Sequence, residues 1–251
     1  MIEQPLRQGE RIDDLIPGGL KIIQNASAPC FSLDAVLLAA FAPLKPGWQV
    51  VDLGTGTGVL PLLLHARESS CSSCGLELMG SMADMARRSV ALNGLENSIR
   101  IITGDIRNAA VLLGKAQADL VTANPPYFQP GRGRESLDPL WAAARSERFC
   151  PLSLLFEQAA LLLKPLGRLA LVHRAERLAE LLSFGREQGL HAERLRLVQP
   201  RLDKPANLLL LEFRKGSRQQ LLIEPALWVY GRGSDYSPEM QAIYQAWEVL
   251  A

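Results

Sequence analysis

The feature that most constrains this sequence is an alternation of short apolar runs with segments of helical periodicity. Seven runs predict strands: Trp48–Leu53, Ser73–Leu78, Ile99–Gly104, Ala118–Ala123, Arg168–His173, Arg194–Val198 and Leu208–Phe213. Five segments between them predict helices: Val59–Arg67, Ser81–Leu92, Asn108–Leu113, Leu152–Leu163 and Arg174–Gln188. Several runs are apolar without polar alternation, which is typical of strands buried on both faces. Strands that alternate with helices indicate a mostly parallel sheet.

The sheet is predicted to end in an antiparallel pair. The runs Arg194–Val198 and Leu208–Phe213 are joined by QPRLDKPAN, which is too short to hold a crossover helix. Parallel neighbours need a crossover of a dozen or more residues, so these strands should pair as a hairpin. We therefore expect an α/β, Rossmann-like fold: a doubly wound, seven-stranded sheet with one antiparallel strand and helices on both faces.

Both ends of the chain lie outside this alternation. A helical run at Ala35–Phe41 has Ser32 as a candidate N-cap. Near the other end, Ser237 precedes Pro and Glu and is a candidate N-cap of a terminal helix. We expect three parts: an N-terminal extension over residues 1–47, a core over 48–216, and a C-terminal extension over 217–251 packed on the core.

Composition limits the class of protein. The 251 residues include 27 Lys and Arg against 26 Asp and Glu, and this net charge of +1 argues against a polybasic nucleic-acid binder. Apolar residues make up 48%, which excludes a disordered chain. The N-terminus MIEQPLRQGERIDD has no apolar run, and the longest apolar stretches are about ten residues, too short to span a membrane. Four cysteines in a chain of this length predict a reduced, cytoplasmic protein. We also expect a monomer.

A glycine-rich turn follows the first predicted strand. Its glycines are Gly54, Gly56 and Gly58, in the order G-x-G-x-G. Glycines let a ligand approach the backbone closely, and the following helix offers free N–H groups at its start. The spacing differs from the G-x-G-x-x-G of dinucleotide folds, and no Lys-Ser/Thr follows, as a P-loop requires. By itself the turn is equally compatible with a tight connection between a strand and a helix.

Acidic residues mark the ends of the first three strands. Asp52, Glu77 and Asp105 occupy these positions, and ligands of open parallel sheets bind beyond the carboxyl ends of the strands. Glu77 is placed to accept from both hydroxyls of a ribose, and Asp105 to accept from an adenine amino group. Each residue alone could instead cap the following helix. Taken with the glycines, the three carboxylates predict one ligand site.

The segment Asn124-Pro-Pro-Tyr-Phe follows the fourth strand. Pro125 and Pro126 lack backbone donors and hold the chain extended, so that their carbonyls project from a rigid ledge. The Asn124 side-chain oxygen and the Pro125 carbonyl can both accept from one planar NH2 group, which stabilises positive charge developing during methyl attack. Tyr127 offers a face for base stacking, and Phe128 shapes the pocket wall. A Pro-Pro turn alone explains the prolines but neither the Asn nor the Tyr.

With these motifs the chain resembles class I S-adenosylmethionine-dependent methyltransferases that act on exocyclic or amide nitrogens. The segments at 8–15, 20–24, 31–38, 124–128 and 144–147 look like the tRNA(Val) adenine-N6 methyltransferase family, and the resemblance spans roughly residues 8–245. It implies methyl transfer from S-adenosylmethionine to N6 of adenine 37, immediately 3′ of the anticodon, in valine tRNA. No metal is implied.

The resemblance also implies roles for individual residues. The implied catalytic residues are Asn124, Pro125, Pro126 and Tyr127. The implied cofactor-binding residues are Ser32, Asp34, Asp52, Gly54, Gly56, Gly58, Glu77, Asp105 and Asn124, with Ser32 and Asp34 in an N-terminal block that folds over the cofactor side. From the residues themselves, we expect substrate binding by Tyr127, Phe128, Arg132, Arg134 and Arg145. Ser146 departs from the family pattern, which has His in the segment Ala-Arg-His-Glu.

Positive charge for RNA binding has two candidate locations. Arg132 and Arg134 lie in the loop after the NPPY segment, and residues 192–218 hold seven Lys and Arg against three Asp and Glu. A solvated loop and a solvated sheet edge explain these charges equally well. Cys71 and Cys74 form a single CxxC without a second pair of ligands, so we expect no zinc site.

Two other functions stay open. A protein glutamine-N5 methyltransferase needs the same acceptors for an amide NH2 group, but such enzymes usually carry a helical recognition domain ahead of the core, and 47 residues are few for one. A non-catalytic module could keep the cofactor fold for RNA contact. Against decay of the site stand its intact glycines, acidic residues and NPPY segment.

Overall fold

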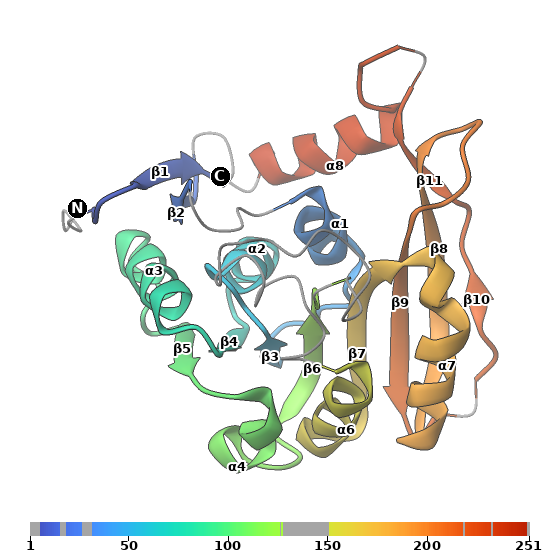
Figure 1. Ribbon diagram of the computed structural model, residues 1–251, viewed down its shortest axis with the longest axis horizontal. Coiled ribbons are helices and arrows are strands. Elements are labelled where there is room, and N and C mark those ends of the chain that lie inside the picture. The colour runs from blue at the N-terminus through green and yellow to red at the C-terminus, as the bar shows by residue number, and fades with distance from the viewer. Residues whose placement is uncertain are drawn as a thin grey trace.

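The computed structural model describes residues 6–15, 19–26, 32–125, 127, 151–217, 219–231 and 233–249 (Figure 1). The seven predicted core strands are present as β3 (Gln49–Leu53), β4 (Ser72–Glu77), β5 (Ile99–Thr103), β6 (Ala118–Ala123), β7 (Leu163–Arg174), β8 (Leu190–Arg201) and β9 (Leu208–Lys215). They form one sheet in the order β8-β9-β7-β6-β3-β4-β5. β9 runs antiparallel to both β7 and β8, and the other core pairs are parallel.

Four short strands were not predicted. β10 (Leu222–Ile223) and β11 (Leu227–Tyr230) pair in parallel with β8, so the main sheet has nine strands within the described residues rather than seven. β1 (Glu10–Asp14) and β2 (Lys21–Asn25) form a separate antiparallel pair, and β2 lies against helix α3 (Gly80–Leu92). Two bonds from β2 to α3 fix this pair: Ile23 N–H donates to Ser89 Oγ, and Lys21 N–H donates to Asn93 Oδ1.

Helices cover both faces of the main sheet, as predicted. One face packs against α1 (Leu33–Phe41), α2 (Val59–Arg67), α3 and α8 (Pro238–Val249), and the other against α4 (Ala109–Leu113), α6 (Leu152–Leu162) and α7 (Leu178–Glu187). Neighbouring residues of one strand pack on opposite faces of the sheet: Val50 packs on the face with α1, and Val51 packs on the face with α6. This double burial explains why the central strands lack polar alternation.

The ends of several elements differ from their predicted ends. β7 and β8 each have 12 residues, twice the length of the apolar runs that predicted them or more. Only the middle of β8, Arg194–Val198, gave a signal, because charged and apolar residues alternate there and the flanking residues do not keep this pattern. α7 begins four residues later than predicted, because a 3-10 turn over Ala175–Arg177 comes first.

The two predicted N-caps differ in the structure. Ser237 Oγ accepts from the Met240 N–H at 3.1 Å, which confirms the cap of α8. Ser32 occupies the N-cap position of α1, but its side chain makes no capping hydrogen bond, so that part of the prediction is wrong. Figure 1 shows α8 lying beside α1, and Met240 and Trp247 of α8 pack into the same apolar layer as α1.

Candidate functional site

The carboxyl ends of β3, β4 and β6 hold most of the polar residues that the sequence analysis selected. The glycine turn after β3 is tied to the end of β4, because the N–H groups of Gly54 and Thr55 both donate to the Leu76 carbonyl, at 2.9 and 3.0 Å. Gly54 and Gly56 have φ angles of +75° and +59°, which residues that carry a Cβ rarely adopt. A Cβ at Gly54 would meet nothing within 4 Å. The turn therefore exposes its backbone to an open space.

Glu77 links the glycine turn to helix α3. Its Oε2 accepts from the Gly56 N–H and its Oε1 from the Met79 N–H, each at 2.9 Å. The side chain is buried, and this burial raises the pKa of the Glu77 carboxyl. Each carboxylate oxygen has two lone pairs, so each can accept one further hydrogen bond from a ligand.

Asp52 is the most deeply buried acidic group of the site, with 1% of its surface exposed. Its Oδ1 accepts from the Thr122 hydroxyl at 2.7 Å, whereas its Oδ2 has no hydrogen-bond partner among the described residues. Burial raises the pKa of Asp52 to about 6. A buried oxygen without a partner costs free energy unless a donor reaches it, and the candidate donors are a bound ligand and the Thr55 hydroxyl, which lowers the pKa of Asp52 against the effect of burial.

Asp105 has the capping role that the sequence analysis kept as its alternative. Its Oδ1 accepts from the Arg107 N–H at 2.9 Å, and its Oδ2 pairs with the exposed Arg107 guanidinium at 2.5 Å. These contacts lower the pKa of the Asp105 carboxyl. A ligand amino group would have to displace the Arg107 side chain from one of these oxygens.

Tyr127 joins three parts of the chain at the end of β6. Its hydroxyl oxygen lies 2.7 Å from Asp34 Oδ2, in the first turn of α1, and 2.8 Å from Asn124 Oδ1. Its ring lies edge-on to the ring of His173, with 5.2 Å between centroids, and the Arg174 guanidinium lies 5.7 Å from the same ring. Burial, together with the negative charge of Asp34, raises the pKa of Tyr127 well above its usual value.

A family model for the methyltransferase small domain matches residues 33–183. This span is more than half of the chain and contains every group of the site from Asp34 to Arg174. The chain belongs to the methyltransferase small domain family.

Individual relatives agree with this assignment. A protein of Porphyromonas gingivalis named tRNA1(Val) (adenine(37)-N6)-methyltransferase is 32% identical over 228 residues, which cover 83% of this chain and 87% of the relative. A predicted O-methyltransferase from Agrobacterium tumefaciens has a similar structure, with a TM-score of 0.69 and 23% identity over 84% of this chain and 95% of that one. TYW2 of P. horikoshii, solved in complex with MeSAdo, has a TM-score of 0.60 and 15% identity over 84% and 73%. The predicted class I methyltransferase fold is confirmed, and the chain is an S-adenosylmethionine-dependent methyltransferase.

Several residues predicted for this methyltransferase site lie outside the described residues: Pro126, Phe128, Arg132, Arg134 and Arg145. Their predicted roles stay predictions. The structure brings together Asp34, Asn124 and Tyr127 on one side of the site. Ser32 stands near this group, two residues before Asp34 at the start of α1, whereas Glu77 is bonded to the glycine turn.

Sequence reasoning missed three residues of this site. Thr122 donates to Asp52, and His173 and Arg174 border the ring of Tyr127. His173 is completely buried, neither of its ring nitrogens has a partner among the described residues, and burial lowers its pKa to about 4. All three stand at the carboxyl ends of β6 and β7, so the rule that selected Asp52 and Glu77 could have found them.

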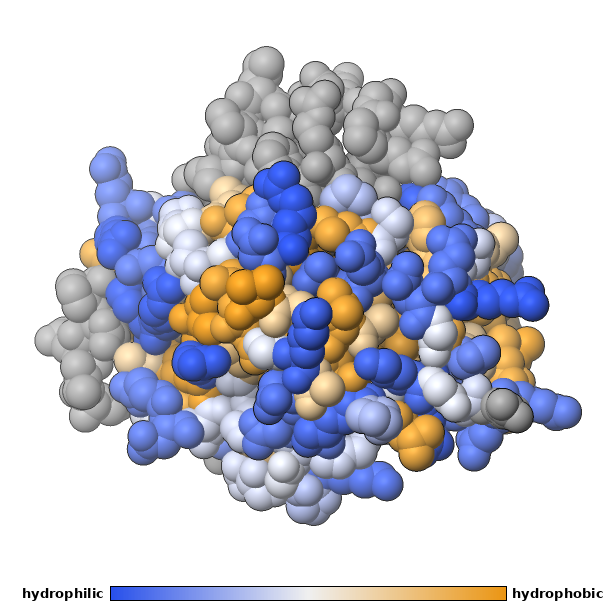
Figure 2. Space-filling view, turned by 90° about the horizontal axis from the view of Figure 1, so that it is seen from below, coloured by the Kyte–Doolittle hydropathy of each residue, from blue (hydrophilic) through white to orange (hydrophobic). Residues whose placement is uncertain are grey.

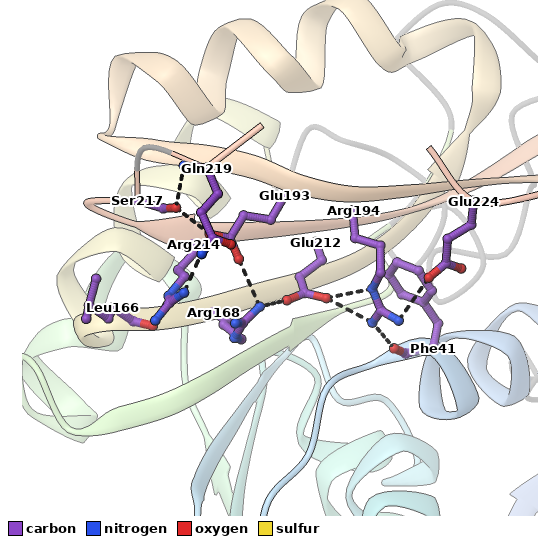
Figure 3. A network of polar contacts seen from close by, with 10 residues as sticks. All are labelled: Phe41, Leu166, Arg168, Glu193, Arg194, Glu212, Arg214, Ser217, Gln219 and Glu224. Carbon is purple, nitrogen blue, oxygen red and sulfur yellow. Dashed lines mark hydrogen bonds and ion pairs between the residues drawn. The ribbon is translucent and has the colours of Figure 1, made fainter. Parts of the chain in front are cut away.

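The predicted basic patch of residues 192–218 is largely neutralised by carboxylates (Figure 3). Glu212, with 3% of its side chain exposed, pairs with Arg168 of β7 and with Arg194 of β8, the latter at 2.8 Å. Glu193 pairs with Arg168 at 3.1 Å and with Arg214 at 3.7 Å. The strands thus carry alternating charges that hold the sheet together, and these arginines are not free to bind phosphate.

Other basic residues of this region are also engaged. Arg194 pairs in addition with Glu224, its guanidinium lies 4.0 Å from the centroid of the Phe41 ring, and Arg196 pairs with Glu239 at 2.5 Å. The remaining contacts go to backbone carbonyls, from Lys215 to Ala160 and Leu163 and from Arg201 to Gly231 and Gly233. Lys204 is exposed, and its ammonium group lies 3.7 Å from the Asp203 carboxylate. The charge count along the sequence therefore overstates the positive surface.

The described residues offer neither a membrane-spanning helix nor a cluster of metal ligands. No helix among them is long and apolar enough to cross a membrane, and no three His, Cys, Asp or Glu side chains among them are grouped as metal ligands. On the face shown in Figure 2, hydrophobic side chains form small patches, the clearest left of the centre, and hydrophilic side chains border them.

Proposed function

We propose that this methyltransferase transfers a methyl group from S-adenosylmethionine to N6 of an adenine in tRNA, and that adenine 37 of valine tRNA is its target. The observation that carries the proposal is the position of Asn124, which directly follows β6 and lies two residues from Thr122, the partner of buried Asp52. An acceptor for an amino group therefore stands beside the cofactor side of the site. The name of the P. gingivalis relative supports the choice of tRNA.

The cofactor would be held by groups from β3 and β4. The open backbone at Gly54 gives space for close approach, and Glu77 keeps acceptor capacity for ribose hydroxyls. The unpartnered Oδ2 of Asp52 fits a cofactor N–H or O–H donor. Asp105 fits the adenine amino group once Arg107 releases an oxygen. When bound, S-adenosylmethionine supplies an electrophilic methyl group on a sulfonium.

The acceptor nitrogen would be activated by two carbonyl oxygens. Asn124 Oδ1 and the Pro125 carbonyl accept the two amino hydrogens, which raises electron density on nitrogen and stabilises its developing positive charge. No covalent enzyme intermediate is needed. The base must leave its stack to reach the site, which costs little in an anticodon loop. The rate then comes from holding nitrogen and methyl carbon about 3–3.5 Å apart.

Methyl transfer from labelled S-adenosylmethionine tests the proposal directly. The acceptors are valine tRNA, the same tRNA with guanosine at position 37, total tRNA, and a peptide with the glutamine of a release factor. We expect N6-methyladenosine in valine tRNA and in total tRNA only. With tRNA as the substrate, we expect the protein to act in the cytoplasm. Label in the glutamine peptide with none in tRNA would favour the protein glutamine-N5 alternative.

Arg132 and Arg134 are the candidate phosphate contacts outside the neutralised strands. Each neutralised phosphate contributes about 0.7–0.9 to the slope of log K against log salt, so replacing both with Ala should flatten the slope for tRNA by roughly 1–2. The control replaces two exposed residues, Lys115 and Arg186, which stand just ahead of β6 and β8 at the opposite edge of the sheet. Identical slopes for all three proteins would remove Arg132 and Arg134 from the interface.

A further inference from the structure

Three polar side chains meet at one phenol hydrogen. The Tyr127 hydroxyl lies within hydrogen-bond distance of two oxygens, Asp34 Oδ2 at 2.7 Å and Asn124 Oδ1 at 2.8 Å. A phenol has one hydrogen to donate, and a carboxylate and an amide carbonyl oxygen only accept. The hydrogen can therefore be donated to only one of the two oxygens at a time. The choice of oxygen decides whether Asn124 Oδ1 can accept a hydrogen bond from a substrate.

The carboxylate is the stronger acceptor. Hydrogen bonds to ionised groups are shorter and roughly twice as strong as bonds between neutral groups. When the Tyr127 hydroxyl donates its hydrogen to Asp34, the lone pairs of its oxygen can accept a hydrogen bond from another group. A half-turn of the Asn124 amide exchanges its oxygen and nitrogen, two atoms whose positions are assigned from the hydrogen-bond network. The amide NH2 group then donates to Tyr127, and Oδ1 is left without that contact.

We propose that Asp34 is a positioning residue that acts through Tyr127 to keep the carbonyl oxygen of Asn124 available for the substrate amino group. This inference rests on the proposed function, because it assigns the state of the acceptor in that site. It gives Asp34 a role on the acceptor side, whereas the sequence analysis placed the residue with the cofactor. Without the Asp34 charge, the Tyr127 hydrogen turns to Asn124 Oδ1 and occupies the atom that must receive the amino hydrogen.

The surroundings of Tyr127 favour this arrangement. The ring is packed against the edge of completely buried His173 and near the Arg174 guanidinium, so its hydroxyl is held between Asp34 and Asn124. Asp34 itself is carried on α1, whose buried side is part of the apolar layer over the sheet. The bond between Asp34 and Tyr127 spans 93 positions of sequence and fixes α1 to the strand edge at this point.

A double-mutant cycle tests the proposal in the full-length protein. At saturating S-adenosylmethionine and tRNA, Asp34→Asn should lower the single-turnover rate about 10- to 100-fold, because the acceptor is blocked. In the Tyr127→Phe background, which has no phenol hydrogen, the same change should alter the rate less than about 2-fold. Asp34→Glu, which keeps the charge one methylene farther out, should retain more of the rate than Asp34→Asn. Its effect should likewise disappear in the Tyr127→Phe background.

The control is Asp14→Asn, the same substitution at an exposed residue of β1 that pairs with Lys21 at 3.1 Å. It should leave the rate unchanged. Affinity for S-adenosylmethionine, measured by calorimetry, should be the same in Asp34→Asn and in the wild type. Rate losses that multiply in the double variant overturn the proposal. A weakened affinity with a full rate at saturation also overturns it, because Asp34 would then contact the cofactor.

A second measurement needs no substrate. The charge of Asp34 is one cause of the raised pKa of Tyr127. In protein with labelled tyrosine, the ring carbon that bears the Tyr127 oxygen should therefore titrate at a lower pH in Asp34→Asn than in the wild type. His173 and Arg174, the other titratable groups that face the ring, are the same in both proteins. An unchanged titration overturns the contact between Asp34 and Tyr127, whereas a wild type that methylates no tRNA overturns only the proposed function.

Discussion

Glu77→Gln separates cofactor binding from folding. The substitution keeps the volume of the side chain and replaces one carboxylate oxygen with an NH2 group. In the wild type the two oxygens accept from Gly56 and Met79 at 2.9 Å each. A glutamine has a single acceptor atom, so one of these N–H groups then faces another donor. The site loses its charge and one acceptor at the same time.

The expected magnitudes follow from these bonds. A charge-assisted hydrogen bond to a ribose hydroxyl is worth about 1.5–3 kcal/mol, so the dissociation constant of S-adenosylmethionine should rise about 10- to 150-fold. The unpaired N–H costs the fold about 1–3 kcal/mol. Part of this cost is offset, because the buried charge that raises the pKa of Glu77 is gone. The net loss of stability should stay near 0–2 kcal/mol, or a few degrees in Tm for a chain of about this size.

Isothermal titration calorimetry and a thermal melt of the same samples measure both quantities. Glu96→Gln is the matched control, since Glu96 is exposed just after the end of α3 and carries the same substitution away from the site. It should change neither value. A folded Glu77→Gln protein that binds S-adenosylmethionine within about 2-fold of wild type would refute the assignment of Glu77 to the cofactor.

Three further changes have expected outcomes. Asn124→Ala should lower the single-turnover rate about 10²- to 10³-fold with unchanged cofactor affinity, and a variant that keeps half of the wild-type rate would exclude the two-acceptor mechanism. Asp52 has its pKa raised from 3.8 to about 6, so its charge destabilises the fold fully above pH 6, and this cost shrinks as the pH falls from 6 towards 4. Asp52→Asn should therefore raise the free energy of unfolding at pH 8 by about 1–2 kcal/mol relative to the wild type, and this difference should shrink towards pH 5. The same substitution should weaken the affinity for the cofactor. Glu212→Ala leaves Arg168 and Arg194 with one carboxylate partner each and should cost about 2–3 kcal/mol, whereas Glu239→Ala, which removes a half-exposed partner of Arg196, should cost about 0–1 kcal/mol in denaturant unfolding.

The sequence predicted the parts of the fold where burial leaves a simple pattern. β6 and α2 have the predicted bounds, because both are buried among apolar neighbours and end at clear breaks. β10 and β11 were missed because strands of two and four residues are too short to show a period. α7 contains Gly185, which lowers helical propensity, but a side chain there would collide with Phe213. Packing of this kind is absent from any local pattern.

The site was predictable where chemistry follows the end of a strand. Asp52 and Glu77 were found from their position relative to β3 and β4, and Asn124 was found from the NPPY segment. The contact of Asp34 with Tyr127 has no such signal, since the two residues are joined only after α1 packs onto the sheet. The surface charge was the property that the sequence predicted least well. Arg194 lies opposite Glu212 in the antiparallel register, so counting residues along one strand could not reveal that they neutralise each other.

The ion pairs across β7, β8 and β9 also restrict which substitutions this protein can accept during evolution. Glu212 pairs with two arginines and Glu193 pairs with two, so replacing either carboxylate weakens the ion pairing of two arginines at once. A single substitution here passes through a destabilised protein, whereas a paired substitution of opposite charges does not. We expect these positions to have drifted jointly, with residues 194 and 212 varying together among relatives, and an alignment in which they vary independently would contradict that history.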